Sequence, residues 1–190
     1  MLRVGGLTPL SASDYPDRLA AVVFCQGCAW RCTYCHNTHL LPARAKGQLP
    51  WPQVLAFLRK RRGLLDAVVF SGGEPTLQRS LPEAIREVKG LGYLIGLHTA
   101  GVVPRMLERV LPLVDWVAMD LKAGWKDHAS VTGVAGSGER ARRSRELILA
   151  SGVACEFHTI AAEPGKPGAQ ADDFADDEER RRLCAPHQGR

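Results

Sequence analysis

Residues 20–39 read AAVVFCQGCAWRCTYCHNTH, and this stretch decides how the rest of the chain is interpreted. It opens with Ala20–Phe24, a short, valine-rich apolar run of the kind that forms a buried strand. The run stops at four of the six cysteines of the chain, which fall within eleven positions: Cys25, Cys28, Cys32 and Cys35. The stretch therefore predicts a buried strand that carries a cysteine-rich loop at its carboxyl end.

The cysteine spacing allows more than one kind of site. The pairs Cys25/Cys28 and Cys32/Cys35 could together hold a structural zinc ion in a tetrahedral site. Alternatively, Cys28, Cys32 and Cys35 could bind three irons of a 4Fe–4S cluster, which usually takes four cysteines, and leave one iron open. Zinc modules usually separate their two pairs by about 12 to 20 residues. Only Ala29–Arg31 separates the pairs here, so the spacing favours the cluster, with a redox dithiol as a further alternative.

Composition indicates a globular domain with a mild basic excess. The chain has 190 residues, 45% of them hydrophobic, a formal net charge of +5 and a pI of about 9.0. The basic runs at 59–62 and 140–145 are expected to be solvated helix faces, because Lys and Arg are normally exposed, so no nucleic-acid partner is predicted. No apolar run approaches the ~20 residues of a membrane span, and no apolar leader precedes the first strand, which predicts a cytoplasmic protein without a membrane partner.

Helix and strand patterns alternate after the cysteine loop. We expect helices from Trp51, from Ser80 with a capping box to Glu83, from Pro104 and at Glu139–Ser151, and strands at Ala67–Phe70, Tyr93–Leu97, Trp116–Met119 and Val153–Ile160, after a short edge strand at Leu2–Gly5. This alternation predicts an α/β fold with a parallel sheet. No GxGxxG or phosphate-loop motif follows a strand, which favours an open, partial (β/α) barrel over a doubly wound nucleotide-binding fold.

The character of the chain changes near residue 161. The segment that follows has Pro-Gly-type breaks, an acidic block, a basic block and almost no large apolar residues. Such a composition cannot bury enough surface to offset the entropy of ordering. We therefore expect a core domain at 1–160 and a low-complexity, disordered tail at 161–190, without an evident sixth strand for the barrel.

Polar or glycine residues follow each expected strand. These segments are Ser71-Gly72-Gly73-Glu74-Pro75, His98-Thr99-Ala100-Gly101, Asp120-Leu121-Lys122 and His158-Thr159. Ligands of parallel βα folds gather at the carboxyl ends of strands, so the segments predict one active site. Paired glycines allow close approach of the backbone to a ligand, and Glu74 can accept from an ammonium group; an ordinary turn is the alternative. Asp120 and Lys122 should point the same way, either toward a nucleoside ligand or as a rim salt bridge.

The cysteine motif, Cys28-x3-Cys32-x2-Cys35 with an aromatic residue before the last cysteine, resembles the signature of the radical S-adenosylmethionine (SAM) superfamily. The longer string with Tyr34, Cys35, His36 and Asn37 is similar to the enzymes that activate glycyl-radical enzymes. The stretch from Asp14 to Cys28 resembles, more narrowly, the activating proteins of anaerobic ribonucleoside-triphosphate reductase. The resemblance covers roughly residues 3–160 and joins several separated motifs.

The resemblance implies a fold, two cofactors and a set of binding residues. The family has a barrel of six βα units, of which this chain shows five. Its cofactors would be a 4Fe–4S cluster on Cys28, Cys32 and Cys35, and SAM. The residues implied as SAM contacts are Tyr34, His36, Gly72, Gly73, Glu74, Asp120 and Lys122. The chemistry belongs to the cofactors, so no side chain is assigned as acid or base.

The resemblance also implies a function and partners. The enzyme would cleave SAM reductively and generate a glycyl radical on anaerobic ribonucleoside-triphosphate reductase, with an electron donor such as flavodoxin. The alternatives are a radical SAM enzyme acting on a small molecule, a truncated inactive remnant and a zinc-stabilised structural module. Cys25 is expected to be a small buried residue. His39, His128 and His187 are expected at the surface and are given no role.

Overall fold

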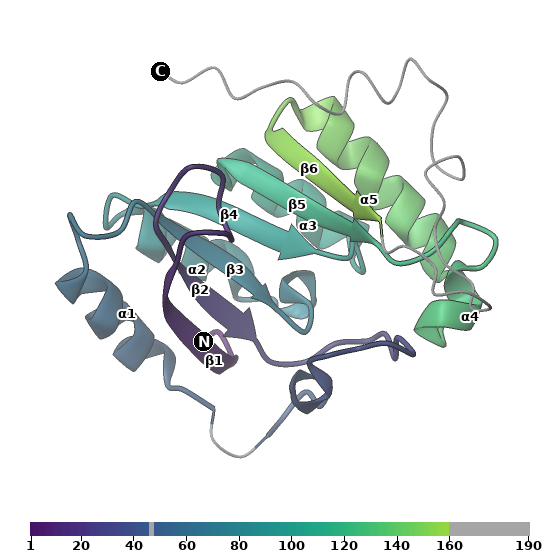
Figure 1. Cartoon of the computed structure of the whole chain (residues 1–190), viewed down its shortest axis with the longest axis horizontal. Coiled ribbons are helices and arrows are strands. Elements are labelled where there is room, and N and C mark those ends of the chain that lie inside the picture. Colours follow the sequence, from purple (N-terminus) through teal and green to yellow (C-terminus); the bar gives the residue numbers. More distant parts are fainter. Residues whose placement is uncertain (46–47, 160–190) are drawn as a thin grey trace.

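The computed structural model describes residues 1–45 and 48–159, which form a six-stranded sheet flanked by helices (Figure 1). The strands are β1 (Val4–Ser11), β2 (Ala20–Cys25), β3 (Ala67–Gly72), β4 (Leu94–Thr99), β5 (Trp116–Leu121) and β6 (Ala154–Thr159). The α-helices are α1 (Trp51–Lys60), α2 (Leu81–Lys89), α3 (Pro104–Val110), α4 (His128–Thr132) and α5 (Ser137–Ser151). Short 3-10 turns lie at Thr38–Leu40, Pro75–Leu77 and Leu111–Leu113.

The strands follow one another across the sheet in chain order. β1 pairs with β2 in the antiparallel sense, and β2 through β6 are parallel. Each parallel neighbour is reached through a crossover that carries helix, as parallel pairing requires. The predicted α/β fold with an open parallel sheet is therefore confirmed.

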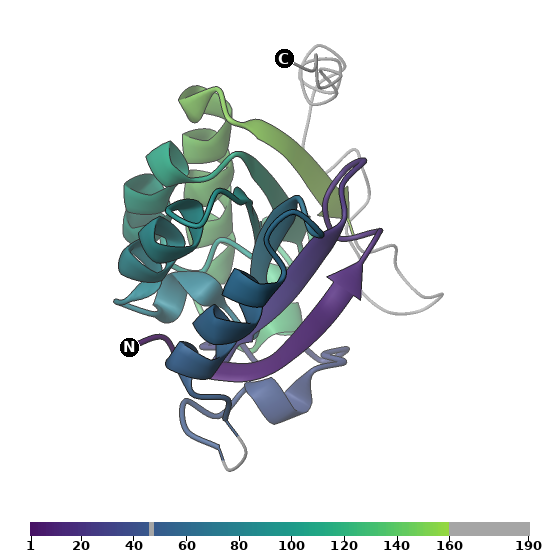
Figure 2. The same ribbon diagram turned by 90° about the vertical axis from the view of Figure 1, so that its left-hand side faces the viewer.

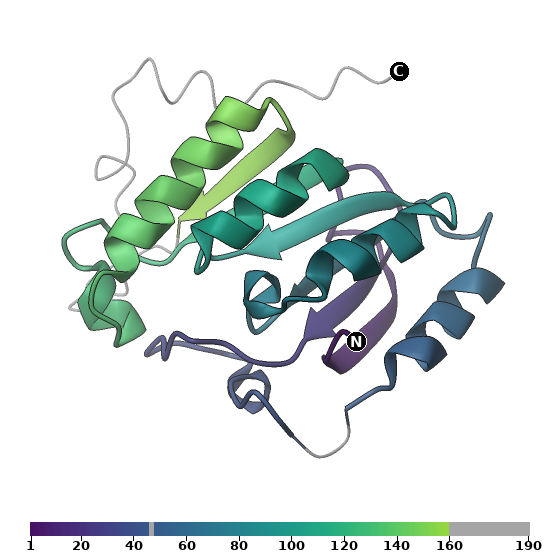
Figure 3. The ribbon, with the colours of Figure 1, turned by 180° about the vertical axis from the view of Figure 1, so that it is seen from behind.

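Helices α1, α2, α3 and α5 cover one face of the sheet, which Figure 2 shows from the side and Figure 3 from behind. The main core lies between these two layers. It joins the apolar helix stripes to alternate strand residues, among them Leu58, Ile85, Leu107, Ile148, Val68, Ile95 and Val117. Burial of these stripes is the principal stabilisation of the layer. The opposite face of the sheet is not covered by these helices and lines the interior of the partial barrel.

The opposite face carries mostly small residues and two large aromatic side chains that are buried. Ala20, Val22, Ala67, Val69 and Ala118 form a second buried cluster with Tyr15 and Trp116. The Tyr15 and Trp116 rings lie with their centroids 5.4 Å apart. These two residues fill the amino-terminal part of this face and leave the carboxyl strand ends for the polar segments.

Several details differ from the sequence-based expectations. The edge strand β1 is longer than predicted and pairs antiparallel with β2. Ser80 precedes α2 but makes no side-chain capping bond, so the predicted capping box is wrong. Helix α4 was missed, because its five residues are too few to show a helical period. The predicted tail lies outside the described residues, and within them the sheet has five parallel strands.

His128 is the clearest error among the surface assignments, because its side chain is completely buried. Burial, with a smaller contribution from the Lys122 charge, lowers its pKa to about 4. The imidazole is therefore neutral in the folded protein at pH 5, whereas in the unfolded chain it is largely protonated. The unfolded state binds more protons between about pH 6.5 and pH 4, so stability falls as the pH falls through this window.

We expect this effect to appear as a pH-dependent difference between the wild type and His128→Phe. Relative to the variant, the wild type should lose about 2 kcal/mol of unfolding free energy between pH 7.5 and pH 5. Urea denaturation of both proteins in the same cluster state at the two pH values measures the difference. A difference that does not change with pH would contradict a neutral, buried His128.

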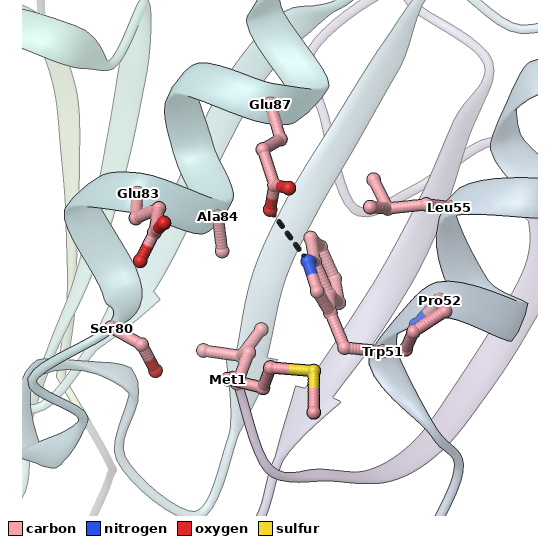
Figure 4. A pocket seen from close by; sticks show the side chains of 9 residues that line it. Met1, Trp51, Pro52, Leu55, Ser80, Glu83, Ala84 and Glu87 are labelled. Carbon is pink, nitrogen blue, oxygen red and sulfur yellow. Dashed lines mark hydrogen bonds between the residues drawn. The ribbon is translucent and has the colours of Figure 1, made fainter.

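A small surface pocket lies on the helical side, between the first turns of α1 and α2 (Figure 4). Trp51, Leu55, Glu83 and Glu87 are among its lining residues, and the Trp51 indole N–H donates to Glu87 at 2.7 Å. No residue predicted for cofactor binding lines it.

Within the part of the chain that the structure describes, no helix is long and apolar enough to cross a bilayer.

Candidate active site

The cysteine loop begins directly at the carboxyl end of β2 and is anchored by backbone hydrogen bonds at its base. The N–H of Gly27 donates to Leu40 O at 2.7 Å, and the N–H of Cys28 donates to Leu41 O at 3.1 Å. Further along, the N–H of Cys35 donates to Cys32 O at 3.1 Å and closes a tight turn. The loop is thus fixed at both ends of the three-cysteine motif.

The three predicted cluster ligands are half-buried free thiols. Burial raises the pKa of Cys28 to about 11; a backbone hydrogen bond at Trp30 opposes this rise, and the nearby Glu74 carboxylate adds to it. Burial also raises the pKa of Cys32, which the Lys122 cation lowers in part. A bound metal charge would reverse this balance and favour the thiolates. The donor set therefore fits a thiolate-bound iron–sulfur cluster.

The described residues show no preformed site for a single metal ion. Across residues 1–45 and 48–159, no three His, Cys, Asp or Glu side chains are placed to hold one metal ion. A structural zinc needs four ligands converging on one point, whereas a 4Fe–4S cluster takes each thiolate on a different iron. The fourth cysteine of the stretch, Cys25, is fully buried in the main core, and burial raises the pKa of its thiol. This confirms its prediction as a core residue.

The Gly72-Gly73 turn at the end of β3 packs directly on the base of the cysteine loop. Gly73 N–H donates to Cys25 O, and Glu74 N–H donates to Gly27 O, each at 2.9 Å. Gly72 has a φ of +118°, and a Cβ there would overlap the Cys25 backbone. A Cβ at Gly73 would lie 2.5 Å from Gly27 O. Only glycine allows this approach, so the turn and the cysteine loop form one unit.

Glu74 points into the protein and is completely buried. One carboxylate oxygen accepts from the N–H and hydroxyl of Thr76 at 3.0 and 2.6 Å and from the Thr99 hydroxyl at 2.7 Å. The other oxygen accepts from Ala100 N–H at 2.9 Å. Burial raises the Glu74 pKa, and these hydrogen bonds oppose the rise. The carboxylate thus joins the loops after β3 and β4, and its predicted contact with the SAM amino group stays a prediction.

Asp120 and Lys122 lie on the same side of the end of β5, as their spacing predicts. Lys122 Nζ contacts Asp120 Oδ2 at 2.7 Å, so the rim salt bridge is present. The Tyr34 hydroxyl donates to Lys122 O at 2.5 Å, which ties the cysteine loop to this strand end. His158 at the end of β6 adds an imidazole 3.5 Å from Asp120. Two strand ends thus reach the cysteine loop, those of β3 and β5, and His158 of β6 adjoins the second of them.

Not every predicted residue joins this arrangement. His36 is exposed one position after Cys35, and its place in a SAM pocket stays a prediction. Thr99 was not assigned a role, although its buried hydroxyl is a principal partner of Glu74. Its position at the end of an expected strand was the signal that could have identified it. His98, also at this strand end, hydrogen-bonds through Nε2 to Asp14 O at 3.0 Å and packs edge-on against Trp116.

A family model described as the radical SAM superfamily matches residues 22–177, most of the chain. The chain belongs to the radical SAM superfamily. Enzymes of this superfamily use a 4Fe–4S cluster and SAM, which agrees with the donor set of the cysteine loop.

Individual relatives of this radical SAM protein refine the comparison. A Methanocaldococcus jannaschii protein named for glycyl-radical enzyme activation is 36% identical over 63% of the chain and 50% of its own length. The pyruvate formate-lyase-activating enzyme of Clostridium pasteurianum is 32% identical over 64% and 53%. The chain thus spans about half the length of these curated relatives. Streptococcus suis SuiB bound to SAM shares the fold, with a TM-score of 0.56, 16% identity and coverage of 72% of this chain and 33% of that one.

Proposed function

We propose that this radical SAM protein activates a glycyl-radical enzyme, and specifically the anaerobic ribonucleoside-triphosphate reductase. The observation that carries the proposal is the joining of the cysteine loop to two other strand ends. The Gly72-Gly73 turn bonds to its base, and Tyr34 bonds to the Asp120–Lys122 segment. An open cluster iron and a SAM-binding surface would then lie side by side.

The protein's own residues would bind and orient the cofactors. Cys28, Cys32 and Cys35 would hold the cluster, and the backbone of the glycine turn would receive the amino acid end of SAM. Lys122 and Asp120 would contact its carboxylate and ribose. When bound, the reduced cluster would supply one electron to break the sulfur–C5′ bond of SAM, which gives methionine and a 5′-deoxyadenosyl radical that can take a hydrogen atom from a glycine Cα. No titrating side chain is needed for this step.

The choice of a protein substrate rests on the relatives and on the open sheet. Two curated relatives are named for the activation of glycyl-radical enzymes or of pyruvate formate-lyase. In the described residues β6 pairs only with β5, so the sheet does not close on itself. A glycine-bearing loop of a partner could enter beside this edge. The resemblance of the stretch from Asp14 to Cys28 to the activating proteins of the reductase supports the reductase as the partner. Flavodoxin as the electron donor, which the wider family resemblance implies, and the cytoplasm as the site of action complete the proposal.

The proposal is tested by anaerobic incubation of the cluster-loaded protein with the reductase, SAM and reduced flavodoxin. We expect electron paramagnetic resonance (EPR) to show a glycyl radical on the reductase, with 5′-deoxyadenosine formed in step with it. SAM cleavage without a glycyl radical on the reductase, or on pyruvate formate-lyase in a parallel incubation, would instead favour a small-molecule enzyme. A fully loaded protein that cleaves no SAM would favour an inactive remnant.

Replacing Cys32 by alanine should abolish SAM cleavage, because the cluster loses one of its three protein ligands. The matched control is Cys155→Ala, which removes a half-buried thiol from β6, away from the motif. We expect Cys155→Ala to keep its iron content and its SAM cleavage. Normal iron content in Cys32→Ala would contradict the assigned ligand set.

A further inference from the structure

The middle of the cysteine loop is held by a buried aromatic contact. Trp30, between Cys28 and Cys32, is 1% exposed, although its neighbours Ala29 and Arg31 are both exposed. Its indole packs edge-on against the His128 imidazole with ring centroids 4.9 Å apart and an interplanar angle of 75°. The buried Trp30 side chain therefore holds the centre of the loop against the protein.

The backbone of the loop is bonded to the same helix. Arg31 N–H donates to Thr132 O at 2.8 Å, and Thr33 N–H donates to Val131 O at 3.1 Å. These carbonyls belong to the last turn of α4, where helix carbonyls lack partners within the helix. The position of α4 therefore sets the position of the loop on both sides of Cys32.

A buried polar network fixes α4 in turn. His128 Nδ1 and the Ser137 hydroxyl are 2.9 Å apart, and the Ser137 and Thr132 hydroxyls are 2.7 Å apart. The Thr132 hydroxyl also donates to His128 O at 2.8 Å. All three side chains are completely buried. The network ties the first turn of α5 to both ends of α4.

We propose that His128 is a positioning residue for the iron–sulfur cluster, which it serves by seating Trp30 and fixing α4 beneath the cysteine loop. The loop that carries Cys28 and Cys32 is thereby shaped before the cluster binds. Such preorganisation should slow cluster loss, because release of the cluster then requires the loop to break its packing against α4. The inference needs the superfamily's cluster, but it does not depend on the proposed glycyl-radical partner.

The experiment measures iron release from cluster-loaded protein to a chelator under anaerobic conditions, together with thermal unfolding of the same samples. His128→Leu removes the ring and its hydrogen bond to Ser137. We expect iron release to be about tenfold faster than in the wild type, because a tenfold change corresponds to the free energy of about one buried interaction. His128→Phe keeps a ring against Trp30. Its rate of iron release should lie at least halfway back from that of His128→Leu to that of the wild type on a logarithmic scale.

Ser144→Ala is the matched control, because Ser144 is equally buried on α5 but donates to Gly101 O, in the loop after β4, at 2.8 Å. It should unfold at a lower temperature while releasing iron within about twofold of the wild type. Should His128→Leu not fold, Ser137→Ala takes its place, with iron release about fivefold faster. Iron release in either test variant that matches Ser144→Ala would overturn the proposal, as would His128→Phe behaving like His128→Leu.

Discussion

Gly72→Ala should destabilise the protein by about 4 kcal/mol or more and prevent normal cluster loading. Two costs add at this position. The φ of +118° is unfavourable for any side chain, and a Cβ would overlap the backbone of Cys25. Neither backbone can move freely, because Gly73 N–H is bonded to Cys25 O. Thermal unfolding should show a midpoint lower by about 10 °C, and iron per chain should fall with it.

Gly63→Ala separates the two costs. Gly63 also has a positive φ, of +78°, but nothing lies within 4 Å of a Cβ there. Its replacement should cost only about 1 to 2 kcal/mol, from backbone strain alone, and should leave the iron content unchanged. Equal losses in Gly72→Ala and Gly63→Ala would show that the contact between the glycine turn and the cysteine loop is not what requires glycine.

Glu74→Ala is expected to cost about 4 kcal/mol, because it leaves several buried donors without an acceptor. The donors are the N–H groups of Thr76 and Ala100 and the hydroxyls of Thr76 and Thr99. Hydroxyls can rotate to new partners more easily than N–H groups can, so the two amides carry most of the cost. Urea denaturation measures the loss, and the KM for SAM should rise as the loops after β3 and β4 separate.

Two further variants make this result specific. Glu74→Gln keeps one acceptor but turns an amide N–H toward Thr76 or Ala100, so it should lose about half as much stability. Glu83→Ala removes an exposed carboxylate from the first turn of α2 and should cost less than about 1 kcal/mol. A Glu74→Ala protein as stable as Glu83→Ala would contradict the assigned network.

Much of the fold follows from local sequence pattern. Ala67–Phe70 and Trp116–Met119 are short apolar runs that fall inside β3 and β5, because a strand buried on both faces needs no polar alternation. The cysteine and glycine segments could be placed as well, since each directly follows such a run. Their meeting at one edge of the sheet is a consequence of parallel pairing, which the helix–strand alternation already implies.

The features that were missed depend on partners far away in sequence. His128 has no local pattern that distinguishes a buried imidazole from an exposed one, and its burial depends on Trp30, almost a hundred residues earlier. Glu74 could be identified as a site residue from its glycines, but its bonds to Thr99 and Ala100 come from the neighbouring strand. Tertiary packing decides such contacts, and spacing in the sequence does not encode it.

The most direct test of whether Cys28, Cys32 and Cys35 hold a SAM-binding cluster is the EPR spectrum of the reduced, anaerobically purified protein before and after addition of SAM. We expect a 4Fe–4S signal that changes shape when SAM is added, because SAM would bind at the cluster held by Cys28, Cys32 and Cys35. A spectrum identical with and without SAM, or zinc bound in place of iron, would contradict it.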